Sequence, residues 1–255
     1  MRNIFTIARK ELKTYFTSPI ACIVLAIGAV IFGFFFYSAL AFFVQRGMES
    51  EMMGRGMPMN VNEFVIRPLL MNLSVISLFL VPMITMRLYA EEKRSGTIEL
   101  LLTSPVRDLE LILGKLLAAF VLYACILGLA LVNLLLLFVY GDADWKPMAA
   151  GFLGVALMGA AFLSLGMLLS TFTRNQIVAG SLTFGLFLML WVADWVSTYS
   201  TTTVGQVANY ISLTTHLENF AKGVIDLRDV VYYLSVIFLG VFLTHRSLES
   251  LRWRS

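Results

Sequence analysis

The side chains that most often carry out chemistry are few in this sequence and lie far apart. There are two histidines, His216 and His245, and two cysteines, Cys22 and Cys125, which both lie within apolar runs. No His-Glu-x-x-His zinc motif and no Gly-x-Ser-x-Gly nucleophile motif is present. The Gly-Lys pair at residues 114–115 is followed by leucine and has no glycine five residues before it, so it is not a phosphate-binding P-loop. We therefore expect no enzyme active site and no nucleotide site in this chain.

Three acidic residues remain as candidates for an intramembrane enzyme. Glu91 and Glu92 are adjacent, as in membrane proteases with paired glutamates, but such enzymes also need histidines at the same depth. Asp194 lies between Trp191 and Trp195, where a belt of aromatic residues at the membrane interface is expected. An intramembrane enzyme that uses these acids is the alternative function we keep.

A second candidate for chemistry is a group of methionines within residues 45–67. Thioether sulfur is a soft ligand suited to Cu(I), but methionine is also adaptable packing material, and no histidine or cysteine joins the group. We expect no metal site, and keep the four thioethers as weak copper candidates: Met52, Met53, Met57 and Met59.

The most informative polar stretch begins at Glu91 and reads EEKRSGTIELLLTSP. Charged residues open it, a glycine interrupts it, Ile98, Leu101 and Leu102 follow at helical spacing, and Pro105 ends it. A short helix with a narrow apolar stripe and dense charge is typical of a surface that docks a protein partner. The expected docking residues are Glu91, Glu92, Lys93, Arg94, Ser95, Gly96, Thr97, Ile98 and Glu99.

Composition indicates where these residues must be placed. The chain is 59% hydrophobic and only 14% charged, against about 45–50% and about 25% in soluble domains. Its mean hydropathy is +0.83, and its net charge is +3. Such a chain cannot cover a water-soluble surface with charge and is too apolar to be disordered. We therefore expect a membrane protein.

Continuous apolar runs of about 20 residues predict helices that cross about 30 Å of hydrocarbon. The fold class is thus an all-α integral membrane protein, a single transmembrane domain over residues 1–255. The sixth run is short, and reaches about 17 residues only if Asp229 and His245 lie at the interfaces. The six expected spans are residues 19–44, 68–86, 116–140, 148–170, 177–196 and 230–244.

The distribution of basic residues predicts the orientation. With the N-terminus in the cytoplasm, the inner segments hold thirteen lysines and arginines and the outer segments hold six. Positive charge favours the cytoplasmic side, so six spans with both termini cytoplasmic are expected. The long connection over residues 87–110 is then cytoplasmic, and residues 197–229, which could form short helices, are outside.

Two further features concern the spans themselves. Residues 1–17 form an amphipathic helix, expected in the membrane interface with Arg9, Lys10 and Lys13 on lipid headgroups. Pro82 lies late in the second span and is expected to kink it. The fourth span is rich in small residues, which allow close helix packing, and packing within one chain is the favoured interpretation.

Together these features resemble the membrane subunit of a type-two ABC transporter. The most specific residues lie in Arg87–Pro105, above all Glu91–Glu99 and Thr103-Ser104-Pro105, and the match continues through Arg107 and Leu113 to Lys115. Within that family the chain looks closest to permeases grouped with gliding motility and copper-enzyme maturation.

The resemblance implies a transport function that depends on partners. It implies a separate P-loop ATPase subunit, which docks on the segment after the second span and binds ATP and Mg. A second permease copy or a related permease would complete a dimer in the bacterial inner membrane, and export is the expected direction. No cofactor in this chain and no nucleic-acid partner are expected. A non-transporting membrane assembly factor is a further alternative.

Overall fold

The computed structural model describes residues 2–52, 60–99, 106–140, 144–199 and 203–252, and these are helical apart from short connections. The all-α prediction is confirmed. Within these described ranges, six helices are long and apolar enough to cross a membrane. These are α2 (Pro19–Met52), α3 (Arg67–Thr85), α6 (Asp108–Tyr140), α7 (Trp145–Ser170), α8 (Gln176–Tyr199) and α11 (Leu227–Arg252). The shorter elements are α1 (Arg2–Thr17), the π-helix η1 (Asn62–Ile66), α4 (Ala90–Ser95), α9 (Thr203–Ile211) and α10 (Leu213–Ala221).

Several helices run beyond the apolar segments that predicted them. Helix α2 continues eight residues past Val44, where Gln45 Nε2 donates to Glu49 Oε1 at 3.2 Å one turn later. Helix α6 begins eight residues before Leu116, and its first turn carries two acids that favour the positive helix N-terminus. A hydropathy pattern ends where charge begins, whereas a helix can continue on its own polar contacts.

The sixth helix corrects the sequence-based expectation most clearly. The short span predicted over residues 230–244 belongs to a 26-residue helix, α11. Its start is fixed because the Arg228 backbone N–H donates to the Asp226 carboxylate at 2.9 Å. Its end is extended by a turn in which Arg246 pairs with Glu249 at 3.0 Å while Leu248 is buried. This last turn lengthens the helix but does not lengthen its apolar segment.

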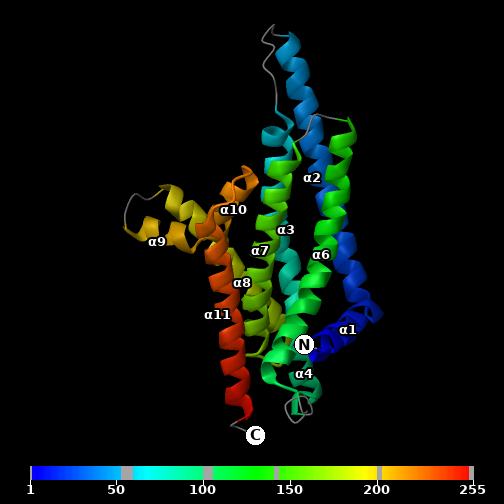
Figure 1. Cartoon of the computed structure of the whole chain (residues 1–255), viewed down its shortest axis with the longest axis vertical. Coiled ribbons are helices and arrows are strands. Elements are labelled where there is room, and N and C mark those ends of the chain that lie inside the picture. The colour runs from blue at the N-terminus through cyan, green and yellow to red at the C-terminus, as the bar shows by residue number, and fades with distance from the viewer. Residues whose placement is uncertain (1, 53–59, 100–105, 141–143, 200–202, 253–255) are drawn as a thin grey trace.

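Helix α7 lies at the centre of the bundle, with α3, α6, α8, α10 and α11 around it (Figure 1). Its small residues permit this arrangement. A Cβ added at Gly159 would lie 2.0 Å from Tyr123 Cε1 of α6, and one at Gly166 would lie 2.4 Å from Thr85 Oγ1 of α3. Ser164 lies against Gly240 of α11 in the same way. The prediction that these residues pack within the chain is confirmed.

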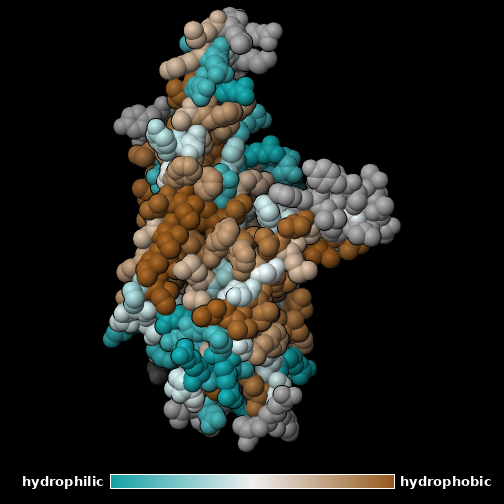
Figure 2. Space-filling model, turned by 180° about the vertical axis from the view of Figure 1, so that it is seen from behind, coloured by the Kyte–Doolittle hydropathy of each residue, from teal (hydrophilic) through white to brown (hydrophobic). Residues whose placement is uncertain are grey.

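The surface has the pattern of a multi-pass membrane protein. Figure 2 shows apolar side chains across the middle of the bundle and polar ones gathered toward its ends. Large apolar side chains of the long helices, such as Phe34 of α2, Val132 of α6 and Phe238 of α11, are exposed. The start of α1 and the end of α11 lie toward the same end of the bundle as α4 (Figure 1), as an even number of crossings requires.

Candidate functional site

The polar end of the bundle near the termini is organised around α4. Helix α3 ends at Thr85, three residues after the buried Pro82, and residues 86–89 turn before α4 begins. Ser170, at the end of α7, accepts hydrogen bonds on its Oγ from the backbone N–H groups of Tyr89 and Ala90, both at 3.0 Å. The start of α4 is therefore anchored to the central helix.

Helix α4 ends at a residue that favours termination. Gly96 has a φ of +73°, the left-handed conformation that commonly caps helix C-termini. Glu91 and Glu92 lie in the first turn and Lys93 and Arg94 in the last, which suits the helix dipole at both ends. Six residues thus form a defined helix rather than a loose turn.

Beneath α4 lies a buried cation that joins three helices. Lys115 of α6 is 1% exposed, and its Nζ donates to Glu92 Oε1 at 2.7 Å, to Glu11 Oε1 at 3.2 Å and to the Leu88 carbonyl at 2.8 Å. The same Nζ lies 5.2 Å from the centre of the Tyr89 ring. We call these five residues the Lys115 cluster. It ties α1, the α3–α4 turn, α4 and α6 together through charge-assisted hydrogen bonds, which are stronger than neutral ones.

A second set of contacts joins α4 to the start of α2. The Arg87 guanidinium binds Glu91 through two bonds, Nε to Oε2 at 2.7 Å and Nη2 to Oε1 at 3.1 Å, and its Nη1 donates to Ser18 Oγ at 3.1 Å. Nearby, the buried Tyr15 hydroxyl of α1 donates to the Ile84 carbonyl of α3 at 3.1 Å. Movement of α4 is therefore constrained to include α1 and the α1–α2 junction.

The expected docking segment divides into two faces. Glu92 and Lys93 point inward, since Lys93 Nζ donates to the Thr171 carbonyl at the end of α7. Residues 94–97 are exposed, and Arg94 makes no ion pair within the described part of the chain. Ile98 is half-buried against the core. The apolar stripe predicted to continue through Leu101 and Leu102 lies outside the described residues.

The remaining candidates are placed as follows. Arg9, Lys10 and Lys13 are exposed on α1, opposite the buried Ala8 and Tyr15, which face the bundle. The apolar side of α1 packs on α6, where a Cβ at Gly114 would lie 2.8 Å from Ile7 Cβ. The helix expected to lie in the interface is thus also part of the protein core.

The methionine and acidic candidates gain no support as reactive sites. Met52, the last residue of α2, is 89% exposed, while Met53, Met57 and Met59 lie outside the described residues. Among the residues that were described, no group of three or more His, Cys, Asp or Glu could hold a metal ion. Asp194 belongs to α8, but its side chain is not among those described.

The far end of the bundle contains a pair that sequence reasoning missed. His216 Nδ1 of α10 lies 2.7 Å from Asp229 Oδ1 of α11, and Nε2 lies 3.2 Å from the Tyr210 carbonyl. Asn219 Nδ2 donates to the other Asp229 oxygen at 2.8 Å. Both ring nitrogens face oxygen partners, so the pair fixes α9, α10 and α11 together.

Sequence reasoning also missed Glu11 and Ser170 as partners of α4. The one usable signal was a lysine, Lys115, directly beside a long apolar run, where a charge needs a partner. Nothing in the sequence indicates that the partners are a carboxylate 104 residues earlier and one 23 residues earlier.

These observations define the class of the protein. An all-helical bundle whose described part contains six helices suited to crossing a membrane is the architecture of a multi-pass membrane protein. The family model of the ABC-2 family transporter protein matches residues 5–240. The chain therefore belongs to the ABC-2 transporter family and is a membrane permease component of an ABC transporter. No curated relative matches the sequence.

Proposed function

We propose that this chain is the membrane subunit of an ATP-driven exporter and is moved by a separate ATPase that docks on the exposed side of α4. The observation that carries the proposal is the two-faced character of this helix. Its inner side is tied to α1, α6 and α7, and its outer side, together with the two residues that follow the helix (residues 94–97), is exposed. A surface that receives force from a partner needs both properties.

The contacts around α4 determine how force would travel. Breaking a buried ion pair by removing one partner costs about 3–5 kcal/mol, so the Lys115 cluster should move as a unit rather than separate. A displacement of α4 then reaches α1 through Glu11, α6 through Lys115 and α7 through Ser170. Pro82 lies inside α3, three residues before its end, and would supply the point at which the second span bends.

The partners and location follow from the family and the charge pattern. A P-loop ATPase subunit would bind ATP and Mg, and this chain would need no cofactor of its own. A second permease copy, or a related permease, would complete the membrane dimer. We place the protein in the bacterial inner membrane with both termini cytoplasmic, on the excess of positive charge near α1 and α4. The gliding-motility and copper-maturation group remains the sub-family that we propose from the Glu91–Glu99 resemblance.

Two discrete arrangements, biased by ATP, are needed for transport. Closure of two ATPases would draw the α4 helices of the two permeases together, and the transmembrane helices would follow. Helix α1, with Arg9, Lys10 and Lys13 toward lipid headgroups, would keep the moving end at the interface.

The test is co-purification of the ATPase with charge-reversed permease. Glu92 and Glu91 are unsuitable because they hold the fold through Lys115 and Arg87. Arg94 is exposed and unpaired in the described chain, so Arg94→Glu should leave the permease folded and reduce bound ATPase. Lys146, exposed on α7 at the opposite end, is the matched control as Lys146→Glu. Undiminished ATPase binding and transport by a folded Arg94→Glu permease would refute the docking surface.

A further inference from the structure

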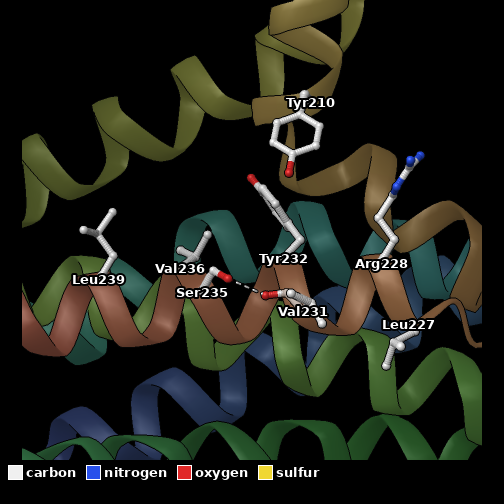
Figure 3. Close-up of a pocket in the computed structure, with 8 residues that line it drawn as sticks. All are labelled: Tyr210, Leu227, Arg228, Val231, Tyr232, Ser235, Val236 and Leu239. Atoms are coloured by element: carbon white, nitrogen blue, oxygen red, sulfur yellow. Dashed lines mark hydrogen bonds between the residues drawn. The ribbon is translucent and has the colours of Figure 1, made fainter.

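A groove runs along α11 at the end of the bundle opposite the termini (Figure 3). It encloses about 460 Å³ and is lined mainly by apolar and aromatic side chains. We call it the α11 groove. Its principal lining residues are Tyr210, Leu227, Val231, Tyr232, Val236 and Leu239.

The length of the groove matches one leaflet of a bilayer. Its lining residues on α11 recur every three or four positions from Arg228 to Leu239 and so form a single stripe. Eleven residues of helix span about 16 Å, and half of a hydrocarbon core of about 30 Å is about 15 Å. An acyl chain that begins at Arg228 would therefore end near the bilayer centre.

The open end of the groove carries a positive charge. Arg228 is exposed, makes no side-chain ion pair within the described residues, and extends from α11 on the side where Tyr210 lies (Figure 3). A second hollow of about 340 Å³ adjoins the first and shares Tyr210 and Arg228 with it. This second hollow is polar and is lined by Gln206 and Asn219 and also by two carboxylates, Asp226 and Asp229. The Asp229 carboxylate is already bound to His216 and Asn219, and that of Asp226 accepts from the Arg228 backbone N–H. A guanidinium presents a planar set of donors that suits phosphate oxygens.

The walls at this end are held by a network of side chains. The Tyr232 hydroxyl donates to the Ile211 carbonyl at 2.6 Å, and the His216 ring stacks on Tyr232 with 3.9 Å between centroids. Tyr210 meets Tyr232 edge to face at 6.1 Å. Because His216 is tied both to Asp229 and to the Tyr210 carbonyl, α10 holds α9 in place, and Tyr210 of α9 forms a fixed roof over this end of the groove. An ordinary lipid-facing helix surface has no such roof.

We propose that the α11 groove binds a phospholipid, with the phosphate at Arg228 and one acyl chain along the stripe from Val231 to Leu239. A water-soluble ligand would leave this apolar stripe unused, and a purely apolar one would leave the arginine unpaired. The site is separate from the α4 surface and does not depend on the ATPase or on the direction of transport. The polar hollow beside it gives room for the rest of the headgroup.

The experiment is titration of the purified full-length chain, in an uncharged detergent, with phosphatidylethanolamine and phosphatidylglycerol, followed by native mass spectrometry. We expect one phospholipid to bind more tightly than any further copy. Arg228→Gln should weaken that first binding about tenfold for both lipids, since both carry the phosphate. Arg246→Gln, which removes an exposed arginine at the other end of the same helix, is the control and should leave it unchanged.

A second pair of variants tests the groove without touching the charge. Ser235 lines the groove and is exposed, so Ser235→Trp should fill the acyl path and abolish the tight binding. Leu234 is also exposed on α11 but is not among the residues that line the groove, so Leu234→Trp should retain the tight binding. A monoglucosyl diacylglycerol of the same chain length should bind about tenfold more weakly than the phospholipids.

Three results would overturn the proposal. The first is equal phospholipid affinity in Arg228→Gln and in the unmodified chain. The second is equal affinity in Ser235→Trp and Leu234→Trp. The third is binding of the uncharged glucolipid as tight as that of the phospholipids, which would indicate an apolar contact without phosphate recognition. The outcome leaves the α4 docking surface untouched, because its own test depends on the ATPase.

Discussion

Replacing Lys115 with methionine should be among the most destabilising single changes in the chain. The ammonium is 1% exposed and lies between the carboxylates of Glu92 and Glu11, which are 14% and 13% exposed. Lys115→Met keeps most of the volume but leaves two largely buried carboxylates facing each other, with only the exposed Lys10, 3.5 Å from Glu11 Oε1, as a neighbouring cation. Removal of one partner from a buried ion pair costs about 3–5 kcal/mol, a large part of a typical stability of about 5–15 kcal/mol.

The expected response to further substitution makes the prediction specific. Replacing a whole buried ionic group by neutral residues is often close to neutral. The triple variant Lys115→Met, Glu11→Gln, Glu92→Gln should therefore be more stable than Lys115→Met alone, by about 2 kcal/mol or more. Unfolding of the purified chain by SDS or by heat in mild detergent measures both differences. Lys146→Met, at an exposed site, should change stability by less than about 0.5 kcal/mol.

The reasoning is wrong if Lys115→Met unfolds within about 0.5 kcal/mol of the unmodified chain. It is also wrong if the costs of the three substitutions simply add, because independent sites add and a shared ionic cluster does not. Either result would mean that the cluster does not hold α4 to α1 and α6.

Three further predictions use the same unfolding measurements. Gly159→Ala should lower the stability of the chain by about 1–3 kcal/mol, because its Cβ would lie 2.0 Å from Tyr123. Gly185→Ala, whose Cβ meets nothing within 4 Å, should instead stabilise α8 by about 0.5–1 kcal/mol. Equal effects of the two substitutions would contradict the central packing of α7. Tyr123→Phe removes a hydroxyl that hydrogen-bonds Ser77 Oγ at 2.8 Å and the Val155 carbonyl at 3.3 Å, and should cost about 1 kcal/mol; a neutral result would argue against those bonds. The hydrogen bond from Lys222, with Arg67 nearby, lowers the pKa of Glu218. The unmodified chain should therefore be more stable than Glu218→Gln by an amount that is constant above about pH 5 and shrinks as pH falls through and below about 4. A stability difference that grows on acidification would refute the assignment.

The sequence was sufficient to predict the helices because lipid leaves few alternatives. In lipid, an apolar run of about 20 residues must pair its backbone N–H and C=O groups with one another, and a helix does this within a single segment. The same logic failed at the helix ends. The last turn of α11 rests on Arg246, Glu249 and Leu248. A hydropathy pattern counts these residues as loop, so the sixth span was expected to be short.

The site was predicted in part, for a comparable reason. The charges of Glu91–Arg94 indicated a polar surface, but they did not indicate which of these side chains face inward. That division depends on Lys115, Glu11 and Ser170, which lie between 23 and 104 residues away from their partners in sequence. The His216–Asp229 pair was missed because its two members were each interpreted as isolated residues of a long outer segment. Pairing over such distances is decided by helix packing, which no local pattern records.

The central claim is that the exposed side of α4 faces the cytosol and receives an ATPase there. Labelling of Thr97→Cys with a membrane-impermeant maleimide tests it directly, in a chain with Cys22 and Cys125 changed to serine. We expect no labelling in intact cells, labelling after permeabilisation, and protection from it when the partner ATPase is bound. Lys146→Cys, at the opposite end of the bundle, should show the reverse sidedness. Labelling of Thr97→Cys in intact cells, or labelling unaffected by bound ATPase, would contradict the account.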